Sequence, residues 1–130
     1  MYKKTVTYTD FDGVERTEDF WFNFTKAEIT EMQLMTDGGL DKYLERIIKS
    51  KDNKAILTAF KELVLKAYGV KSDDGRRFIK NDEIRAEFAQ TEAYSDIFIE
   101  LATDEEAASA FINGVTPNVE APKNQVAPAK

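Results

Sequence analysis

The stretch from residue 53 to residue 69, NKAILTAFKELVLKAYG, constrains the fold more than any other part of the chain. Its apolar residues recur at a spacing of three and four, which places them on one face of a helix. Further apolar residues widen that face, and the whole set is Ile56, Leu57, Phe60, Leu63, Val64, Leu65, Ala67 and Tyr68. A helix that is apolar around most of its circumference must be covered from more than one side. We therefore expect a central core helix, capped by Asp52 and ended by a left-handed Gly69.

The first 24 residues carry the alternating pattern of a β-hairpin. Residues 3–9 and residues 16–24 predict two strands, and the turn cluster at residues 10–13 joins them through Gly13. One face of this hairpin is strongly apolar, with Val6, Tyr8, Phe20, Phe22 and Phe24. A lone hairpin is marginally stable in water, so we expect this face to lie against helices.

Local start and stop signals divide the remainder into helices. Residues Thr25 to Glu28 and Thr103 to Glu106 read as capping boxes, and Asn81 and Thr91 are expected to cap two helices between them. A glycine pair at 38–39 separates the first helix from an amphipathic helix over 40–49, in which Glu45 and Lys49 form a pair. Residues 73–75 form a turn between two short extended arms, Val70 and Phe78–Ile79. Gly114 is expected to end the last helix.

These signals predict an α+β fold that is mainly α, with an N-terminal β-hairpin packed on a compact bundle of about five or six helices. Residues 1–115 are expected to form a single globular domain, with the hairpin over 3–24 and the helices over 26–115. All three prolines lie after residue 115, where no apolar periodicity remains, so residues 116–130 are interpreted as a flexible tail.

Composition narrows the chemistry that the chain can perform. It has no cysteine and no histidine, which removes disulfides, thiolate metal sites and the commonest general base. The net charge of −6 repels phosphate backbones, so no nucleic-acid partner is expected. No signal-like or membrane-spanning apolar run is present, and we expect a soluble intracellular protein that contacts no membrane. With no nucleophile–base constellation, we expect no enzyme activity and no cofactor.

Three features admit a functional reading beside a structural one. The segment Asp10–Gly13 begins like a calcium loop but lacks the later ligands, so we interpret it as a turn. Met32 and Met35 could form an adaptable partner surface, although core filling is the favoured interpretation. Trp21 lies on the hairpin face opposite the phenylalanines, with Asp19 and Asn23. Alternation alone leaves open whether Trp21 anchors an interface or is covered by a C-terminal helix.

With these segments in place, the chain resembles the tail assembly chaperones of long, non-contractile-tailed phages or related prophages of Gram-positive hosts. The resemblance is carried by residues 7–29, TYTDFDGVERTEDFWFNFTKAEI, and by residues 65–115, LKAYGVKSDDGRRFIKNDEIRAEFAQTEAYSDIFIELATDEEAASAFINGV. It implies a compact helical protein with an N-terminal hairpin. In this family a ribosomal frameshift commonly adds a C-terminal extension to a minority of copies, and the proline-containing tail fits such a junction.

The resemblance implies a non-virion factor in the host cytoplasm that coats the helical tape measure protein until tail-tube protein polymerises around it. Its partners would be the tape measure protein, the tail-tube protein and further copies of the chain. We expect the outer face of the hairpin, with Trp21, Asp19 and Asn23, to be one contact surface. The alternative is a minor structural virion component, such as a head–tail connector or tail-completion protein. The resemblance implies no catalytic residues.

Overall fold

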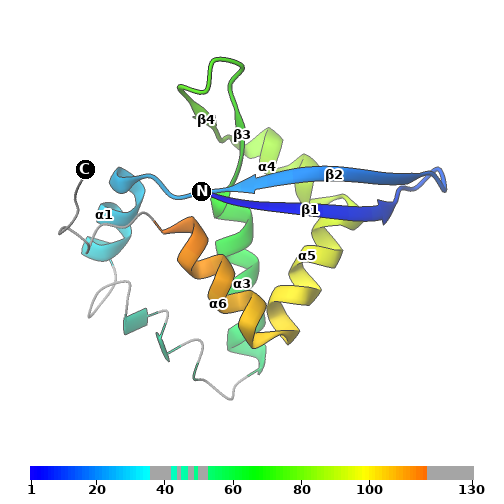
Figure 1. Cartoon of the computed structure of the whole chain (residues 1–130). Helices are drawn as coiled ribbons and strands as arrows, with labels where there is room; N and C mark the ends of the chain where they lie inside the picture. Colours follow the sequence, from blue (N-terminus) through cyan, green and yellow to red (C-terminus); the bar gives the residue numbers. More distant parts are fainter. Residues whose placement is uncertain (36–41, 44, 47–48, 50–52, 117–130) are drawn as a thin grey trace.

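The computed structural model describes residues 1–35, 42–43, 45–46, 49 and 53–116. Within these ranges the sheet is built from β1 (Tyr2–Thr9), β2 (Glu15–Phe22), β3 (Tyr68–Lys71) and β4 (Phe78–Ile79). The helices are α1 (Lys26–Met35), α3 (Asn53–Ala67), α4 (Asp82–Ala89), α5 (Glu92–Thr103) and α6 (Glu105–Val115). Figure 1 shows α3, α5 and α6 gathered on one side of the β1–β2 hairpin, with α1 at the end opposite the hairpin turn. The predicted α+β, mainly α class with an N-terminal hairpin is confirmed.

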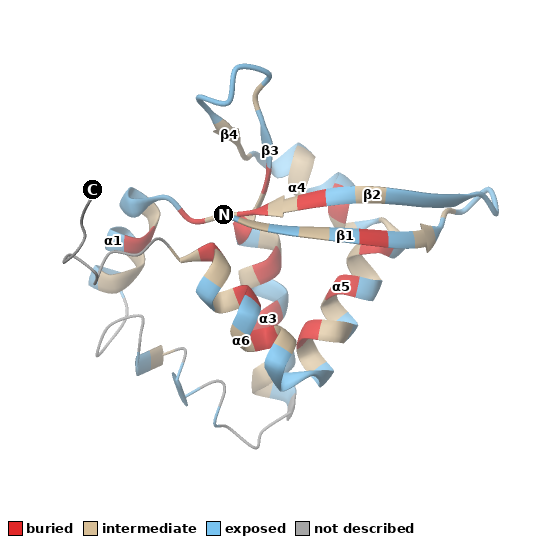
Figure 2. Ribbon diagram, viewed as in Figure 1, coloured by how far each residue is buried: buried red, intermediate tan, exposed pale blue. Residues whose placement is uncertain are grey.

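The hairpin has an apolar face toward the helices and a polar face toward solvent. Its strands pair in antiparallel register from Tyr2 with Phe22 to Thr9 with Glu15. The even-numbered residues Val6, Phe20 and Phe22 are buried, and Phe24 just beyond β2 is buried as well (Figure 2). The residues of β1 that face the other way are all exposed: Lys3, Thr5, Thr7 and Thr9. The predicted aromatic inner face is therefore confirmed.

The central helix is shorter and less enclosed than predicted. Phe60 and Val64 are buried on α3, as expected, but Leu57 is 43% exposed. The helix ends at Ala67, and the next two residues pair with β2, Tyr68 with Phe22 and Gly69 with Trp21. The prediction of a left-handed Gly69 was wrong, because among the described residues the positive-φ glycines are Gly13 and Gly75.

Gly69 has a packing role in β3 instead. A Cβ atom at this position would lie 2.7 Å from the Phe78 ring, so only glycine allows β3 and β4 to approach this closely. The two predicted extended arms are present as β3 and β4, and Gly75 forms the turn between them with φ of 76°. Strand β3 pairs with β2 and β4 pairs with β3, which turns the predicted hairpin into a four-stranded sheet that the sequence pattern did not show.

Phe22 is the centre of an aromatic cluster that joins the sheet to the helices. It is fully buried, and its ring centroid lies between 5.7 and 6.1 Å from those of Tyr2, Tyr68, Phe88 and Phe111. Tyr68 and Phe88 stack at 4.1 Å. Tilted and edge-on pairs of this kind add stabilisation beyond the area that they bury. Strands β1, β2 and β3 are thereby held to α4 and α6 through one side chain.

The predicted helix caps are mostly present. The Thr25 amide donates to Glu28 Oε1 at 2.8 Å and the Glu28 amide donates to Thr25 Oγ1 at 3.2 Å, which confirms the first capping box. Asn81 and Thr91 cap α4 and α5 as expected.

The second capping box was wrong by one residue. Asp104 caps α6 by accepting from the amides of Glu106 and Ala107. Thr103 is the last residue of α5, and its hydroxyl donates to the Ile99 carbonyl at 2.7 Å. One residue, Asp104, therefore both ends α5 and begins α6.

Gly114 does not end the last helix, because α6 continues through it to Val115. A Cβ atom here would lie 2.7 Å from Tyr2 Cδ1 and 3.0 Å from Tyr2 Cβ. Glycine is therefore the residue that lets α6 approach β1, at the cost of lower intrinsic helix propensity.

Several predictions concern residues outside the described ranges: the glycine stop at 38–39, the cap at Asp52, most of the helix over 40–49 and the tail after residue 116. From the helix over 40–49, the predicted pair is present, with Lys49 Nζ 3.9 Å from Glu45 Oε2.

We predict that Phe22→Ala and Phe60→Ala each lower the free energy of unfolding by about 3–5 kcal/mol, because both remove a buried ring and leave a cavity. Phe22→Ala should be the worse of the two, since Phe60 has no ring partner in the described aromatic cluster. Urea denaturation of both variants measures the difference. A Phe22→Ala stability close to that of the parent would contradict the central role of this ring.

We predict that Gly114→Ala destabilises the protein even though alanine is the better helix former by about 1 kcal/mol. The added methyl group meets Tyr2, so its cost should shrink in a Tyr2→Ala background, where the contact with the ring is removed and the contact with Cβ at 3.0 Å remains. Thermal unfolding of the two single variants and the double variant measures this coupling. Equal effects of Gly114→Ala in both backgrounds would show that Tyr2 is not the constraint.

Candidate protein-binding surfaces

The outer face of the sheet carries Trp21 between two lysines. Trp21 is half-buried in β2, where it pairs with Lys3 of β1 and Gly69 of β3. Lys71 Nζ lies 4.2 Å and Lys3 Nζ 5.5 Å from the indole ring centroid. The helices lie on the opposite side of the hairpin (Figure 1), and Trp21 is not among the buried core residues. The indole is therefore flanked by two ammonium groups, a cation–π arrangement, and is not covered by a C-terminal helix.

The other two residues of the predicted surface differ in their roles. Asp19 is exposed on the same face and accepts a hydrogen bond from the Thr5 hydroxyl at 2.6 Å. Asn23 lies just beyond β2, where its amide donates to the Ala67 carbonyl and its carbonyl accepts from Lys80 Nζ. The backbone of Asn23 therefore fixes the end of the strand. Binding by Trp21, Asp19 and Asn23 stays a prediction.

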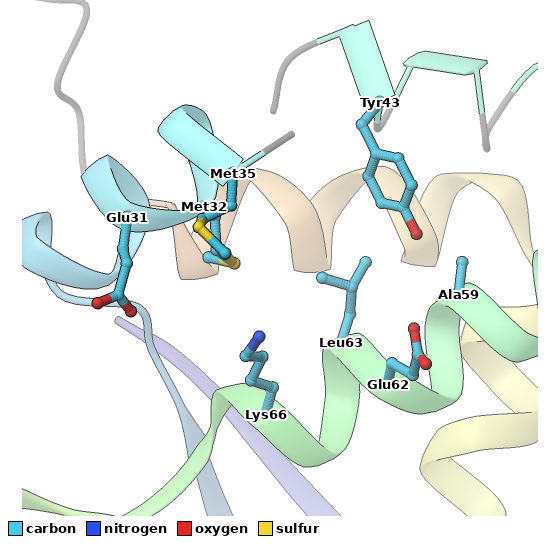
Figure 3. A pocket seen from close by; sticks show the side chains of 8 residues that line it. All are labelled: Glu31, Met32, Met35, Tyr43, Ala59, Glu62, Leu63 and Lys66. Carbon is cyan, nitrogen blue, oxygen red and sulfur yellow. The ribbon is translucent and has the colours of Figure 1, made fainter. Parts of the chain in front are cut away.

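A second candidate surface is an apolar groove between α1 and α3. It has a volume of about 490 Å³, with Met32 and Met35 on one wall, Ala59 and Leu63 on the other, and Tyr43 above them (Figure 3). Glu31, Glu62 and Lys66 also line it. Met32 packs against the core, but Met35 is 82% exposed, so the interpretation of both methionines as core filling was wrong for Met35. Methionine side chains adapt to partners of varied shape.

This groove was not predicted from the sequence, because Leu63 belongs to the apolar circumference of α3, which was expected to be covered. One signal in the sequence could have indicated it. The helix has more apolar positions than one neighbouring layer of the fold can cover, so some of them remain at the surface. Leu34, next to Met35, is also 82% exposed and extends the apolar surface at the end of α1.

An ion pair between Glu28 and Lys80 holds α1 against the sheet and so positions one wall of the groove. Lys80 Nζ lies 2.8 Å from Glu28 Oε2 and 2.8 Å from the Asn23 carbonyl oxygen, above the Phe24 ring. Burial lowers the pKa of Lys80, partly offset by the hydrogen bond to Glu28. Burial alone would raise the pKa of Glu28, but the hydrogen bonds from Lys80 and Thr25 outweigh it and lower that pKa.

A third surface is the tip of the hairpin, where Phe11 is 77% exposed and Val14 53% exposed. Asp10 organises this turn: Oδ1 accepts from the amides of Asp12 and Val14, both at 2.9 Å. Gly13 adopts a φ of 82°. The interpretation of this segment as a turn is confirmed, because the Asp10 carboxylate accepts hydrogen bonds from the backbone of its own loop.

The described ranges contain no group of three or more acidic side chains placed to hold a metal ion. None of the helices within those ranges is long and apolar enough to cross a bilayer.

Apolar side chains exposed at a groove and at a turn, each beside charged residues, are typical of a protein that binds other proteins through its surface. A family model described as phage tail assembly chaperone matches residues 1–125, and the chain belongs to that family. Tail assembly chaperones are in general non-catalytic, in agreement with the expectation of no enzyme activity. No curated protein and no solved structure matches the chain.

We predict that the pair between Glu28 and Lys80 makes stability depend on pH. Because the folded-state pKa of Glu28 is lowered, its contribution is present above the unfolded value, about 4.3 for glutamate, and is lost as the pH falls through the folded value. Glu28→Gln should therefore lower the melting temperature at pH 7. The melting temperature of this variant should also fall less than that of the parent between pH 5 and pH 2, roughly the range around the pKa of Glu28.

Glu31→Gln on the same helix is the matched control, because Glu31 is exposed and lines the groove without an ion pair in the described part of the chain. It should retain the pH dependence of the parent. Parallel pH profiles for Glu28→Gln and the parent would contradict the assignment.

Proposed function

We propose that this phage tail assembly chaperone binds the tape measure protein and masks its apolar surface until tail-tube protein polymerises around it. The observation that carries the proposal is the family match over residues 1–125. A long helical protein with exposed apolar faces aggregates unless those faces are covered, and a soluble acidic protein present in many copies can cover them.

The outer face around Trp21 is the client surface that we propose. An indole with two ammonium groups beside it can bury an apolar side chain of the client and pair with its carboxylates. Asp19, in turn, can accept from a basic residue, so the face offers both signs of charge next to one apolar anchor. This arrangement suits a helix whose apolar residues alternate with charged ones.

The proposal has further parts. The chaperone acts in the host cytoplasm, is absent from the mature virion and serves a phage or prophage with a long non-contractile tail in a Gram-positive host. It contacts tail-tube protein when the tube forms, and copies associate along the client. Mass spectrometry of purified particles tests the absence from the virion. A stoichiometric amount of this chain in virions would favour a structural virion component instead.

We predict that Trp21→Ala leaves the protein folded but weakens retention of tape measure protein in a co-expression pull-down. Removal of an anchoring tryptophan costs on the order of 2 kcal/mol, which is about a thirtyfold loss of affinity. Trp21→Phe should restore part of the binding, because an aromatic face remains for the two lysines.

Ile99→Ser is the matched control, since Ile99 is an apolar residue of α5 that is 58% exposed and lies away from the outer face. It should retain the client. Unfolding of Trp21→Ala would show that the indole is structural, and undiminished retention by a folded Trp21→Ala would remove the outer face from the proposal.

A further inference from the structure

The outer face of the β1–β2 hairpin carries opposite charges at its two ends. At one end Trp21 lies between Lys3 and Lys71, whose ammonium groups are 5.5 Å and 4.2 Å from the indole ring centroid. At the other end Glu15, an even number of residues from Trp21 along β2 and so on the same face, is exposed. It has no ion pair among the described residues. The face therefore runs from a basic end with an apolar anchor to an acidic end.

The middle of this face is made of short polar side chains that already have partners. The Thr5 hydroxyl donates to Asp19 Oδ1 at 2.6 Å, and the hydroxyls of Thr7 and Thr17 lie 2.9 Å apart. Polar groups that are hydrogen-bonded within the chain lose less when they leave water than unpaired groups do. Because threonine is small, a second sheet can approach this part of the face to the usual distance of about 10 Å.

A second copy of the same face complements these charges when the two hairpins run in opposite directions. Consider a two-fold axis that lies between the two sheets and crosses β2 midway between Asp19 and Thr17. Trp21 of each copy is then opposite Glu15 of the other, because both are three residues from the axis. The carboxylate of Glu15 comes beside the ammonium groups at the indole, and Asp19 is opposite the uncharged Thr17. Hairpins stacked in the same direction would instead place Lys3 on Lys3, which charge repulsion disfavours.

We propose that two copies of this chain stack through their outer faces as an antiparallel pair, with Glu15 of each copy beside Trp21 of the other. The contact is isologous, so each interaction occurs twice and the pair is closed. The helices lie on the other side of the hairpin and leave the outer face free for this contact (Figure 1). The pairing rests on the surfaces of this chain alone. Its consequence, that Trp21 stays covered until a client displaces the second copy, rests on the proposed function.

The pair is weak and reversible, because the contact is small. From residue 15 to residue 21, at about 3.3 Å for each residue, the face is about 20 Å long and two strands wide. This is less than the area of a standard stable interface. Client binding can therefore replace the pairing without a large cost.

The first test uses the full chain without any client. The chain has one tryptophan, so its fluorescence reports directly on Trp21. As the protein concentration rises, sedimentation velocity should show the 14.8 kDa monomer giving way to a dimer. Acrylamide quenching of Trp21 should decrease over the same range of concentration. A parent that is monomeric at every concentration, or a dimer with unchanged quenching, would overturn the proposal.

Charge reversal tests the antiparallel arrangement. Lys3→Glu and Glu15→Lys should each raise the dissociation constant about tenfold, because two attractive contacts become repulsive in each pair. An equimolar mixture of the two variants should recover the affinity of the parent, since every lysine then meets a glutamate. The two positions are about 20 Å apart within one chain, so this recovery requires a contact between copies. Both residues are exposed, so both variants should melt like the parent.

Lys61→Glu is the matched control, because it gives the same net charge as Lys3→Glu at an exposed position of α3. It should pair like the parent. A mixture of Lys3→Glu and Glu15→Lys that pairs no better than either variant alone would overturn the antiparallel arrangement.

The pairing and the proposed function fail separately. A parent that never pairs, together with loss of client retention in Trp21→Ala, would overturn the pairing and support the proposed function. Pairing with the expected charge dependence, together with undiminished client retention by Trp21→Ala, would support the pairing and remove the outer face from client binding.

Discussion

The packing of Phe22 is the interaction on which the rest of the structure depends. This ring is in contact with aromatic side chains from β1, β3, α4 and α6, so it joins elements that are far apart in the sequence. A two-stranded hairpin gains its stability from what covers its apolar face. Here the helices that cover it contact β1 at two places, where Tyr2 approaches Gly114 of α6 and where Lys4 forms a salt bridge with Glu100 of α5 at 2.6 Å.

Burial of one face of the sheet leaves the other face free for recognition. The strand alternation that turns Phe20 and Phe22 inward turns Trp21 outward, and strand pairing brings Lys3 and Lys71 from two neighbouring strands beside it. The groove has a different origin. One helical layer covers only part of the apolar circumference of α3, and the remainder faces α1 across a gap that Met32 and Met35 line. Membership of the tail assembly chaperones agrees with a molecule that exposes apolar surface in defined places.

Much of the fold was predictable because its signals are local. The turn at Gly13, the capping box from Thr25 to Glu28 and the cap at Asn81 depend on residues within a few positions of one another, and the structure contains them all. The inner face of the hairpin follows from alternation alone. Local signals predict only part of the candidate site. Alternation places Trp21 on the outer face, but it does not show that two lysines lie beside the indole, because one of them is fifty residues away in β3.

What the sequence determined by itself was therefore the set of elements and the side of each that seeks burial, because propensity, capping and periodicity act over a few residues. Tertiary structure decided which of these elements meet. Gly69 and Gly114 carry a glycine signal typical of helix ends, yet one lies in a strand against Phe78 and the other inside a helix against Tyr2. The groove and the pairing of β3 with β2 also arise only from contacts between distant segments. Such contacts are chosen by the packing of whole side chains, which no local pattern encodes.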